Sequence, residues 1–220
     1  MTSNTTRQRG RPPGPPRDPA VRRAEILDAA ERVVARTGTS LTIAEVATEA
    51  GYARTAVYAV FPDLPALVDG LAERHMEAII AAADAILARP LPGRELLRAL
   101  VELISDFVDR NPGLHHLLMQ RLQSDDGHGR PFFARSADWA TGVFDRMLRA
   151  IDADPAPARV WATATVGAIT MSAEEWGRHR DRDRAEFVDR LTAFLWPPLA
   201  GVGLDRFVGP LGGLADPRSK

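Results

Sequence analysis

The chain has 220 residues, of which 45% are hydrophobic, and a formal net charge of −1, so it is long enough and apolar enough to bury a substantial core. It contains no cysteine, which excludes disulfides, thiolate metal sites and a cysteine nucleophile. Residues 1–60 carry nine arginines against six acidic residues although the whole chain is slightly acidic, and this asymmetry favours a localised anionic partner.

Residues 1–19 are rich in proline, glycine and arginine, and we expect them to form a disordered basic arm. They contain no apolar segment of the kind that secretory signals carry. Nowhere does the chain reach the roughly 20 consecutive apolar residues of a membrane span. We therefore expect a soluble, cytoplasmic protein without a membrane partner.

Residues 20–63 have the pattern of three short helices. Apolar residues recur at helical spacing after the arm, and Gly38 ends the first helix. Thr42 stands three residues before Glu45, which is the spacing of a capping box at the start of a second helix. Gly51 suits a left-handed turn, and another short helix follows it. This order is typical of a helix-turn-helix domain, in which the last helix enters the DNA major groove.

Residues 64–200 predict further amphipathic helices, separated by breaks that contain proline or glycine. Asp63 is the candidate N-cap of the first of them. No segment indicates a strand. Residues 201–220 are rich in glycine and proline, and we expect a loose C-terminal tail. The alternative is that Leu204, Phe207 and Leu211 pack against the rest of the protein. The expected fold class is all-α, with an N-terminal three-helix helix-turn-helix domain followed by a larger helical ligand-binding and dimerisation domain.

Three runs of sequence occur together at one characteristic spacing: ILDAA at 26–30, LTIAEVATEAG at 41–51 and VYAVFP at 57–62. Over about residues 20–70 the chain thereby resembles the N-terminal domain of TetR-family transcriptional regulators. The resemblance implies a homodimer that binds double-stranded DNA. It further implies a repressor that a small-molecule effector releases from a palindromic operator.

The resemblance also assigns roles in DNA binding. Thr42 is expected to cap the second helix and touch a phosphate, since helix N-termini attract phosphate. Arg54 and Thr55 begin the recognition helix and are expected to face base edges or backbone, because arginine binds guanine bidentately. Tyr58 is expected to reach a phosphate through its hydroxyl.

Three positions depart from the residues that are common in the family. Ala53 stands where a small hydroxyl residue often caps the recognition helix, Val60 where histidine or tyrosine is frequent, and Leu64 where a lysine commonly contacts phosphate. Each lost contact weakens sequence-independent binding, so we expect weaker DNA binding than in a typical member.

The arm offers a second contact with DNA. Arg9 and Arg11 belong to an Arg-Gly-Arg-Pro run that resembles the core of an AT-hook, an extended segment that lies in the minor groove of A/T-rich DNA. The alternative is a solvated leader without a DNA contact.

The larger domain supplies candidates for an apolar ligand pocket, and the alternative for each is an ordinary core position. The candidates are Phe107, Leu118, Met119, Leu122, Phe144, Trp161 and Met171, with Trp139 and Trp176 as further ones.

The last two predicted helices supply candidates for the dimer interface. Small residues there allow close approach of helices, and apolar residues form a face; the alternative is packing inside one chain. The candidates are Gly167, Ala168, Ser172, Phe187, Leu191, Phe194 and Leu195.

The sequence gives little indication of metal binding or of catalysis. His115, His116, Asp125, Asp126 and His128 are of metal-binding types, but adjacent histidines on a helix point about 100° apart, so we expect no metal and no cofactor. The sequence has no G-x-S-x-G, no H-E-x-x-H and no phosphate-cradling glycine loop, so we expect no enzyme. Two alternatives stay open: a ligand-independent regulator that prefers A/T-rich DNA, and a ligand-binding module with a degenerate helix-turn-helix.

Overall fold

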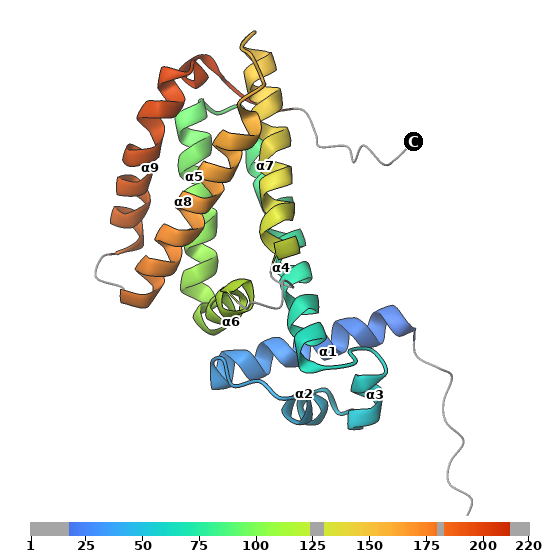
Figure 1. Ribbon diagram of the computed structural model, residues 1–220. Helices are drawn as coiled ribbons and strands as arrows, with labels where there is room; N and C mark the ends of the chain where they lie inside the picture. Colours follow the sequence, from blue (N-terminus) through green and yellow to red (C-terminus); the bar gives the residue numbers. More distant parts are fainter. Residues whose placement is uncertain (1–17, 124–129, 180–182, 212–220) are drawn as a thin grey trace, which may run out of the picture.

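The structure is a computed structural model that describes residues 18–123, 130–179 and 183–211, with the backbone alone at 122–123 and 130–133. The described part of the chain is helical and contains no strand, so the fold is all-α as predicted. Figure 1 shows α1, α2 and α3 grouped at one end, a larger bundle of α5 to α9, and α4 running between the two groups.

The helices have the following bounds: α1 Pro19–Thr37, α2 Ile43–Ala50, α3 Arg54–Tyr58, α4 Leu64–Leu87, α5 Gly93–Arg110, α6 Pro112–Gln123, α7 Arg130–Ala150, α8 Ala158–His179 and α9 Arg184–Gly201, followed by the 3-10 turn η1 Leu204–Arg206.

Side-chain caps begin several of these helices. The carboxylate of Asp18 accepts a hydrogen bond from the backbone N–H of Ala20 at 2.9 Å, and Asp63 does the same for Ala66 at 2.7 Å. Each such cap satisfies one of the backbone donors that a helix leaves free at its first turn. Gly38, with φ of +68°, ends α1 in a conformation that other residues rarely adopt. The expected cap of α4 at Asp63 is therefore the one that the structure shows.

One apolar core holds the small domain together. Val33 of α1, Val57 of α3 and Phe61 are almost wholly buried in it. The first turns of α4 contribute to the same core through Leu67, and α6 does so through Leu118. The packing of this domain thus extends beyond residue 63 and includes two helices of the larger domain.

The end of the last helix differs from expectation. Helix α9 continues through Pro197 and Pro198 to Gly201, although a proline removes a backbone hydrogen bond. Both prolines are exposed, and so are Ala193 and Phe194, the residues four positions earlier whose carbonyls lose the usual helical donor.

Residues 204–211 follow the alternative that the sequence left open beside a loose tail, because they are packed against the larger domain. Leu204, Phe207 and Leu211 are buried in the core between α5, α7 and α8. Three apolar side chains within eight residues bury enough surface to order a glycine-rich segment. The rest of the expected tail, residues 212–220, lies outside the described residues.

Candidate DNA-binding surface and ligand cavity

The turn between α2 and α3 has the geometry of a helix-turn-helix. The hydroxyl of Thr42 accepts a hydrogen bond from the backbone N–H of Glu45 at 3.2 Å and donates one to its carboxylate at 2.7 Å. Gly51 ends α2 in the left-handed conformation, with φ of +69°. Helix α3 follows only three residues later and lies at the outer end of the molecule (Figure 1).

Helix α3 divides its side chains between the core and the surface. Val57 faces the core and is wholly buried. Arg54, Thr55 and Tyr58 are exposed, with half of the Tyr58 surface accessible. Thr42 is exposed as well. The structure therefore brings the four predicted DNA-binding residues of the folded domain onto its outer surface, while Arg9 and Arg11 lie outside the described residues.

The departures from the family pattern have structural roles of their own. Ala53 is the N-cap residue of α3, and no side chain caps this helix. Val60 and Leu64 are half-buried and pack against the core of the small domain. Neither side chain has a group that binds phosphate, so these positions stabilise the fold instead.

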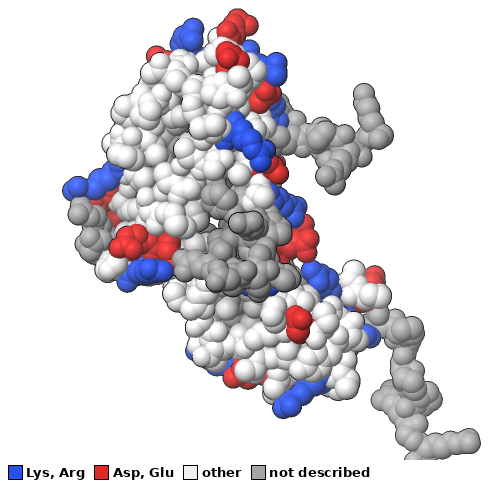
Figure 2. Space-filling view, in the orientation of Figure 1, with Lys and Arg blue, Asp and Glu red and all other residues white. Residues whose placement is uncertain are grey.

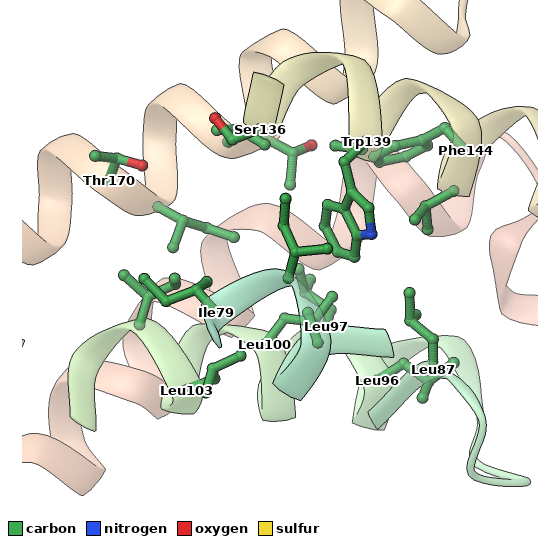
Figure 3. Close-up of a pocket in the computed structure, with 18 of the residues that line it drawn as sticks. Ile79, Leu87, Leu96, Leu97, Leu100, Leu103, Ser136, Trp139, Phe144 and Thr170 are labelled. Carbon is green, nitrogen blue, oxygen red and sulfur yellow. The ribbon is translucent and has the colours of Figure 1, made fainter. Parts of the chain in front are cut away.

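The larger domain encloses a cavity of about 160 Å³ between α4, α5, α7 and α8 (Figure 3). Its wall is almost entirely aliphatic and aromatic. Among the described residues that line it, the polar side chains are His115, Ser136, Thr165 and Thr170 and the indoles of Trp139 and Trp196, and none is arginine or lysine. The indole N–H of Trp139 is already bonded to Asp84 at 2.9 Å. Such a space suits an apolar molecule, or the apolar part of an amphipathic one.

The predicted pocket residues have different positions. Phe107, Leu118, Met119 and Phe144 line the cavity. Trp161 is half-buried against the neighbouring core and is not part of the wall. Met171 is half exposed on α8, also away from the wall. Leu122 belongs to α6, but its side chain lies outside the described residues.

Several wall residues cannot be recognised from the sequences of the single helices that carry them. They come from the buried faces of α4 and α5, whose apolar stripes are visible in the sequence but indistinguishable from ordinary core. Those that Figure 3 labels are Ile79, Leu87, Leu96, Leu97, Leu100 and Leu103.

The end of the cavity at α6 holds a buried pair of titratable groups. Nε2 of His115 lies 2.6 Å from a carboxylate oxygen of Glu174, and both side chains are more than nine-tenths buried. Arg178 also contacts this carboxylate, at 2.9 Å, and compensates its charge. Burial lowers the pKa of His115 below its ordinary value, and Glu174 opposes this shift only in part. His115 is therefore neutral near pH 7. Its side chain makes this internal contact with Glu174. Of the other residues of metal-binding types, Asp125, Asp126 and His128 lie outside the described residues.

Helix α6 connects the cavity with the small domain. Leu118 lines the cavity and at the same time belongs to the core beneath α1, α2 and α3. A Cβ atom at Gly113 would lie only 3.1 Å from the backbone carbonyl oxygen of Val34 in α1, so the two helices are in close contact there. On α4, the ring of His75 lies beside Phe107 of the cavity wall, tilted by 46° with centroids 5.5 Å apart, and is 3.1 Å from Glu31 of α1. A displacement of the wall residues on α4 or α6 would therefore change the contacts of these helices with α1.

The outer face of α8 and α9 is apolar. Phe194 is 74% exposed, and Val160 and Met171 are also more than half exposed. Figure 2 shows few charged side chains over these two helices. Of the residues predicted for the dimer interface, Gly167, Ala168 and Ser172 are half-buried on α8.

The other predicted interface residues pack within the chain. Leu191 and Leu195 are buried against α5 and α8. The ring of Phe187 is half-buried and stacks on Trp176 with centroids 5.1 Å apart. Of the apolar face expected on α9, Phe194 is the member that points outward.

Within the residues that the structure describes, no helix combines the length and the hydropathy that crossing a membrane requires.

Comparison with known proteins agrees with this arrangement. Residues 26–71 match the family model described as bacterial regulatory proteins of the tetR family. The transcriptional activator FasR of Mycolicibacterium smegmatis is 28% identical over 220 residues, covering 93% of this chain and 98% of that protein. FadR of Bacillus subtilis, solved in complex with stearoyl-CoA, superposes with a TM-score of 0.66 at 15% identity, over 78% of this chain and 96% of that one. The repressor FadR of Thermus thermophilus, solved with lauroyl-CoA, gives a TM-score of 0.64 at 19% identity, over 79% and 93%.

Proposed function

We propose, from the premise that this chain belongs to the TetR family of bacterial regulatory proteins, that it is a dimeric repressor released from DNA when an apolar ligand fills its cavity. The observation that carries the proposal is the double role of Leu118, which lines the cavity and packs in the core of the helix-turn-helix domain. A ligand that displaces this side chain acts directly on the support of the DNA-binding helices.

In this proposal α3 lies in the major groove. Arg54 and Thr55 face base edges or backbone, and Tyr58 donates its hydroxyl to a phosphate. Their exposure on the outer surface, opposite the buried Val57, supports these roles. Thr42 brings the N-terminus of α2 to a neighbouring phosphate.

The effector is proposed to carry an acyl or alkyl chain. A wall without arginine or lysine among the described residues offers no partner for a buried anion, so only an uncharged, apolar part of a ligand enters it favourably. The two FadR proteins of similar fold were solved with acyl-CoA molecules, which combine an apolar chain with a charged head. A charged head would remain outside this cavity.

Release follows from linkage between the two sites. The ligand must bind the conformation that is unsuited to DNA better than the one that is suited to it. Helices α4 and α6 are the elements that both sites share, so their displacement changes the position of α3. The coupling is reciprocal: operator DNA lowers the affinity for the ligand by the same factor as the ligand lowers the affinity for DNA.

Dimerisation is proposed to occur through the outer face of α8 and α9, where Val160, Met171 and Phe194 are exposed. A two-fold axis there presents two copies of α3 to one side of the DNA. Recognition of two half-sites roughly 34 Å apart, one turn of the double helix, then requires a palindromic operator.

One observation favours activation of transcription as a second candidate function. FasR, which matches nearly the whole chain, is named an activator. The same DNA-binding dimer activates if its operator lies beside the promoter rather than over it, so the position of the bound site decides between the two.

The test selects fragments of genomic DNA on the immobilised full-length protein and then adds stearoyl-CoA or lauroyl-CoA, with CoA alone as control. Enrichment of a palindromic site and its release by the acylated molecules support the proposal. Enrichment of A/T-rich DNA without a palindrome, unaffected by either ligand, would support a ligand-independent regulator instead.

A further inference from the structure

The segment that follows α9, residues 202–211, forms one end of the cavity; we refer to it as the closing segment. Leu204 in it is 99% buried and is part of the cavity wall. Phe207 and Leu211 are buried behind it in the adjoining core. The closing segment is thus a structural wall of the ligand cavity, although it lies at the C-terminal end of the described chain.

Backbone hydrogen bonds fasten the closing segment to the connection between α4 and α5. The N–H of Gly93 donates to the carbonyl of Phe207 at 3.0 Å. In the other direction, the N–H of Gly209 donates to Leu91 and that of Leu211 donates to Leu87, both at 3.0 Å. These bonds fix the distance of the segment from the two helices that form the floor of the cavity.

The closing segment packs closely against the start of α5 at this end of the cavity. A Cβ atom at position 93 would lie 2.7 Å from the backbone carbonyl oxygen of Leu204 and 3.1 Å from the ring of Trp196. A contact with backbone at 2.7 Å cannot be relieved by a side-chain rotation, so a residue larger than glycine would push the segment outward. Gly93, Trp196 and Leu204 all line the cavity, and together they define where it ends.

The polarity of the wall changes along the cavity. Figure 3 shows Leu87, Leu96 and Phe144 on one side of the space, whereas the hydroxyl-bearing Thr170 and Ser136 lie toward the other. The side that adjoins the closing segment is lined by aliphatic and aromatic groups. This difference favours an orientation in which the terminal carbons of an amphipathic ligand lie against Leu204.

We propose that Leu204 determines the maximum length of the apolar chain that the cavity accepts, and hence which members of a homologous series act as effectors. The inference rests on the proposed function of the cavity as the effector site. Chains that end before Leu204 leave space unfilled, and longer chains must displace the closing segment with its hydrogen bonds and its buried side chains.

The test measures displacement of the neutral fluorescent probe N-phenyl-1-naphthylamine by primary alkanols from hexanol to hexadecanol. For the wild-type protein we expect the affinity to rise about fourfold with each added methylene and then to stop rising at one chain length. Leu204→Trp is expected to move this limit to a shorter alkanol and Leu204→Ala to a longer one. Val208→Trp, in the same segment but with a side chain that is 60% exposed, is the matched control and keeps the wild-type limit.

The outcomes separate the two proposals. If the wild-type protein binds alkanols and both Leu204 variants keep its chain-length limit, Leu204 does not set the length and this inference is wrong. If no alkanol displaces the probe from the wild-type protein, the cavity is not an apolar ligand site and the proposed function fails with it. Because Leu204→Ala introduces no bulk, it provides the result even where Leu204→Trp does not fold.

Discussion

Tyr58 and Val57 are neighbours on a helix of five residues, yet one is half exposed and the other wholly buried. At the scale of single residues, such divisions are what the sequence predicts best, because helical periodicity decides which side chain faces the core. Positions that face a cavity are harder to find, since an apolar side chain has the same pattern whether it meets another side chain or an empty space. Phe107 and Phe144 were predicted for the cavity and Leu96 was not, although all three line it.

The hydroxyl of Tyr58 is expected to contribute a phosphate contact. Tyr58→Phe should weaken binding to specific and random DNA alike, by about 1 kcal/mol or roughly fivefold, because a phosphate contact carries no sequence information. Arg54→Ala, by contrast, should reduce the preference for the operator over random DNA. Both are measured as dissociation constants on the two DNAs, with the exposed Arg94→Ala on α5 as control. Equal affinities of Tyr58→Phe and the wild type for both DNAs would show that the Tyr58 hydroxyl does not contact a phosphate.

His115 makes the stability of the fold depend on pH. Burial lowers the pKa of His115 in the folded protein, whereas in the unfolded chain it returns to about 6.5. Below that pH the unfolded chain binds a proton that the folded protein does not, so the free energy of unfolding falls as the pH decreases toward the folded pKa.

The measurement compares urea unfolding at about pH 7.5 and about pH 5.5 for the wild type and His115→Gln. The wild type should lose more stability than His115→Gln over this interval. His179→Gln, whose side chain is 63% exposed and lies outside this cluster, is the control and should behave like the wild type. An equal loss in wild type and His115→Gln would mean that His115 does not titrate as proposed.

At the scale of secondary structure, the helix starts could be predicted because capping is a local interaction. Thr42 and Asp63 cap the helices that the sequence assigns to them. The C-terminal end could not be predicted in the same way. The helix through Pro197 and Pro198 depends on solvent exposure, which a local pattern does not show. The sequence offers Leu204 as a residue that could pack, but the choice between a packed and a loose segment depends on contacts with residues far away in the chain.

The contribution of helix capping should be measurable as a change in the free energy of unfolding. Thr42→Ala removes the cap of α2 and should lower the free energy of unfolding by about 1 kcal/mol, whereas Thr42→Ser should retain most of it. Ala53→Ser supplies the side-chain cap that α3 lacks and should raise stability by up to about 1 kcal/mol. Urea unfolding at one fixed protein concentration gives these values. A destabilised Ala53→Ser variant would show that the start of α3 cannot accept this cap.

At the scale of the whole molecule, the two domains share α4 and α6, so the boundary that the sequence places at residue 63 does not separate two independent cores. Leu67 and Leu118 support the small domain from within the larger one. Sequence patterns divide a chain where helices end, whereas packing joins helices from both sides of such a break. The sharing itself is what permits a ligand in one domain to influence DNA binding by the other.

The proposed dimer depends on the exposed apolar face of α8 and α9. Phe194→Asp places a charge where the partner subunit is expected to bury a ring, and should yield monomers at micromolar concentration. Val21→Asp changes an exposed apolar residue of α1 and should leave the dimer intact. Sedimentation velocity distinguishes the two states. A Phe194→Asp variant that stays dimeric would place the interface elsewhere.

One measurement tests most directly whether the protein is a dimer that binds DNA selectively and releases it when ligand binds. Fluorescence anisotropy of a labelled operator fragment, titrated with the full-length protein at two salt concentrations, compares its affinity with that of random DNA of equal length. We expect saturation at two protomers per site, selective binding that weakens as salt increases, and release when a ligand fills the cavity. Binding no tighter than to random DNA, or selective binding that ligand occupancy of the cavity leaves unchanged, would contradict the proposed function.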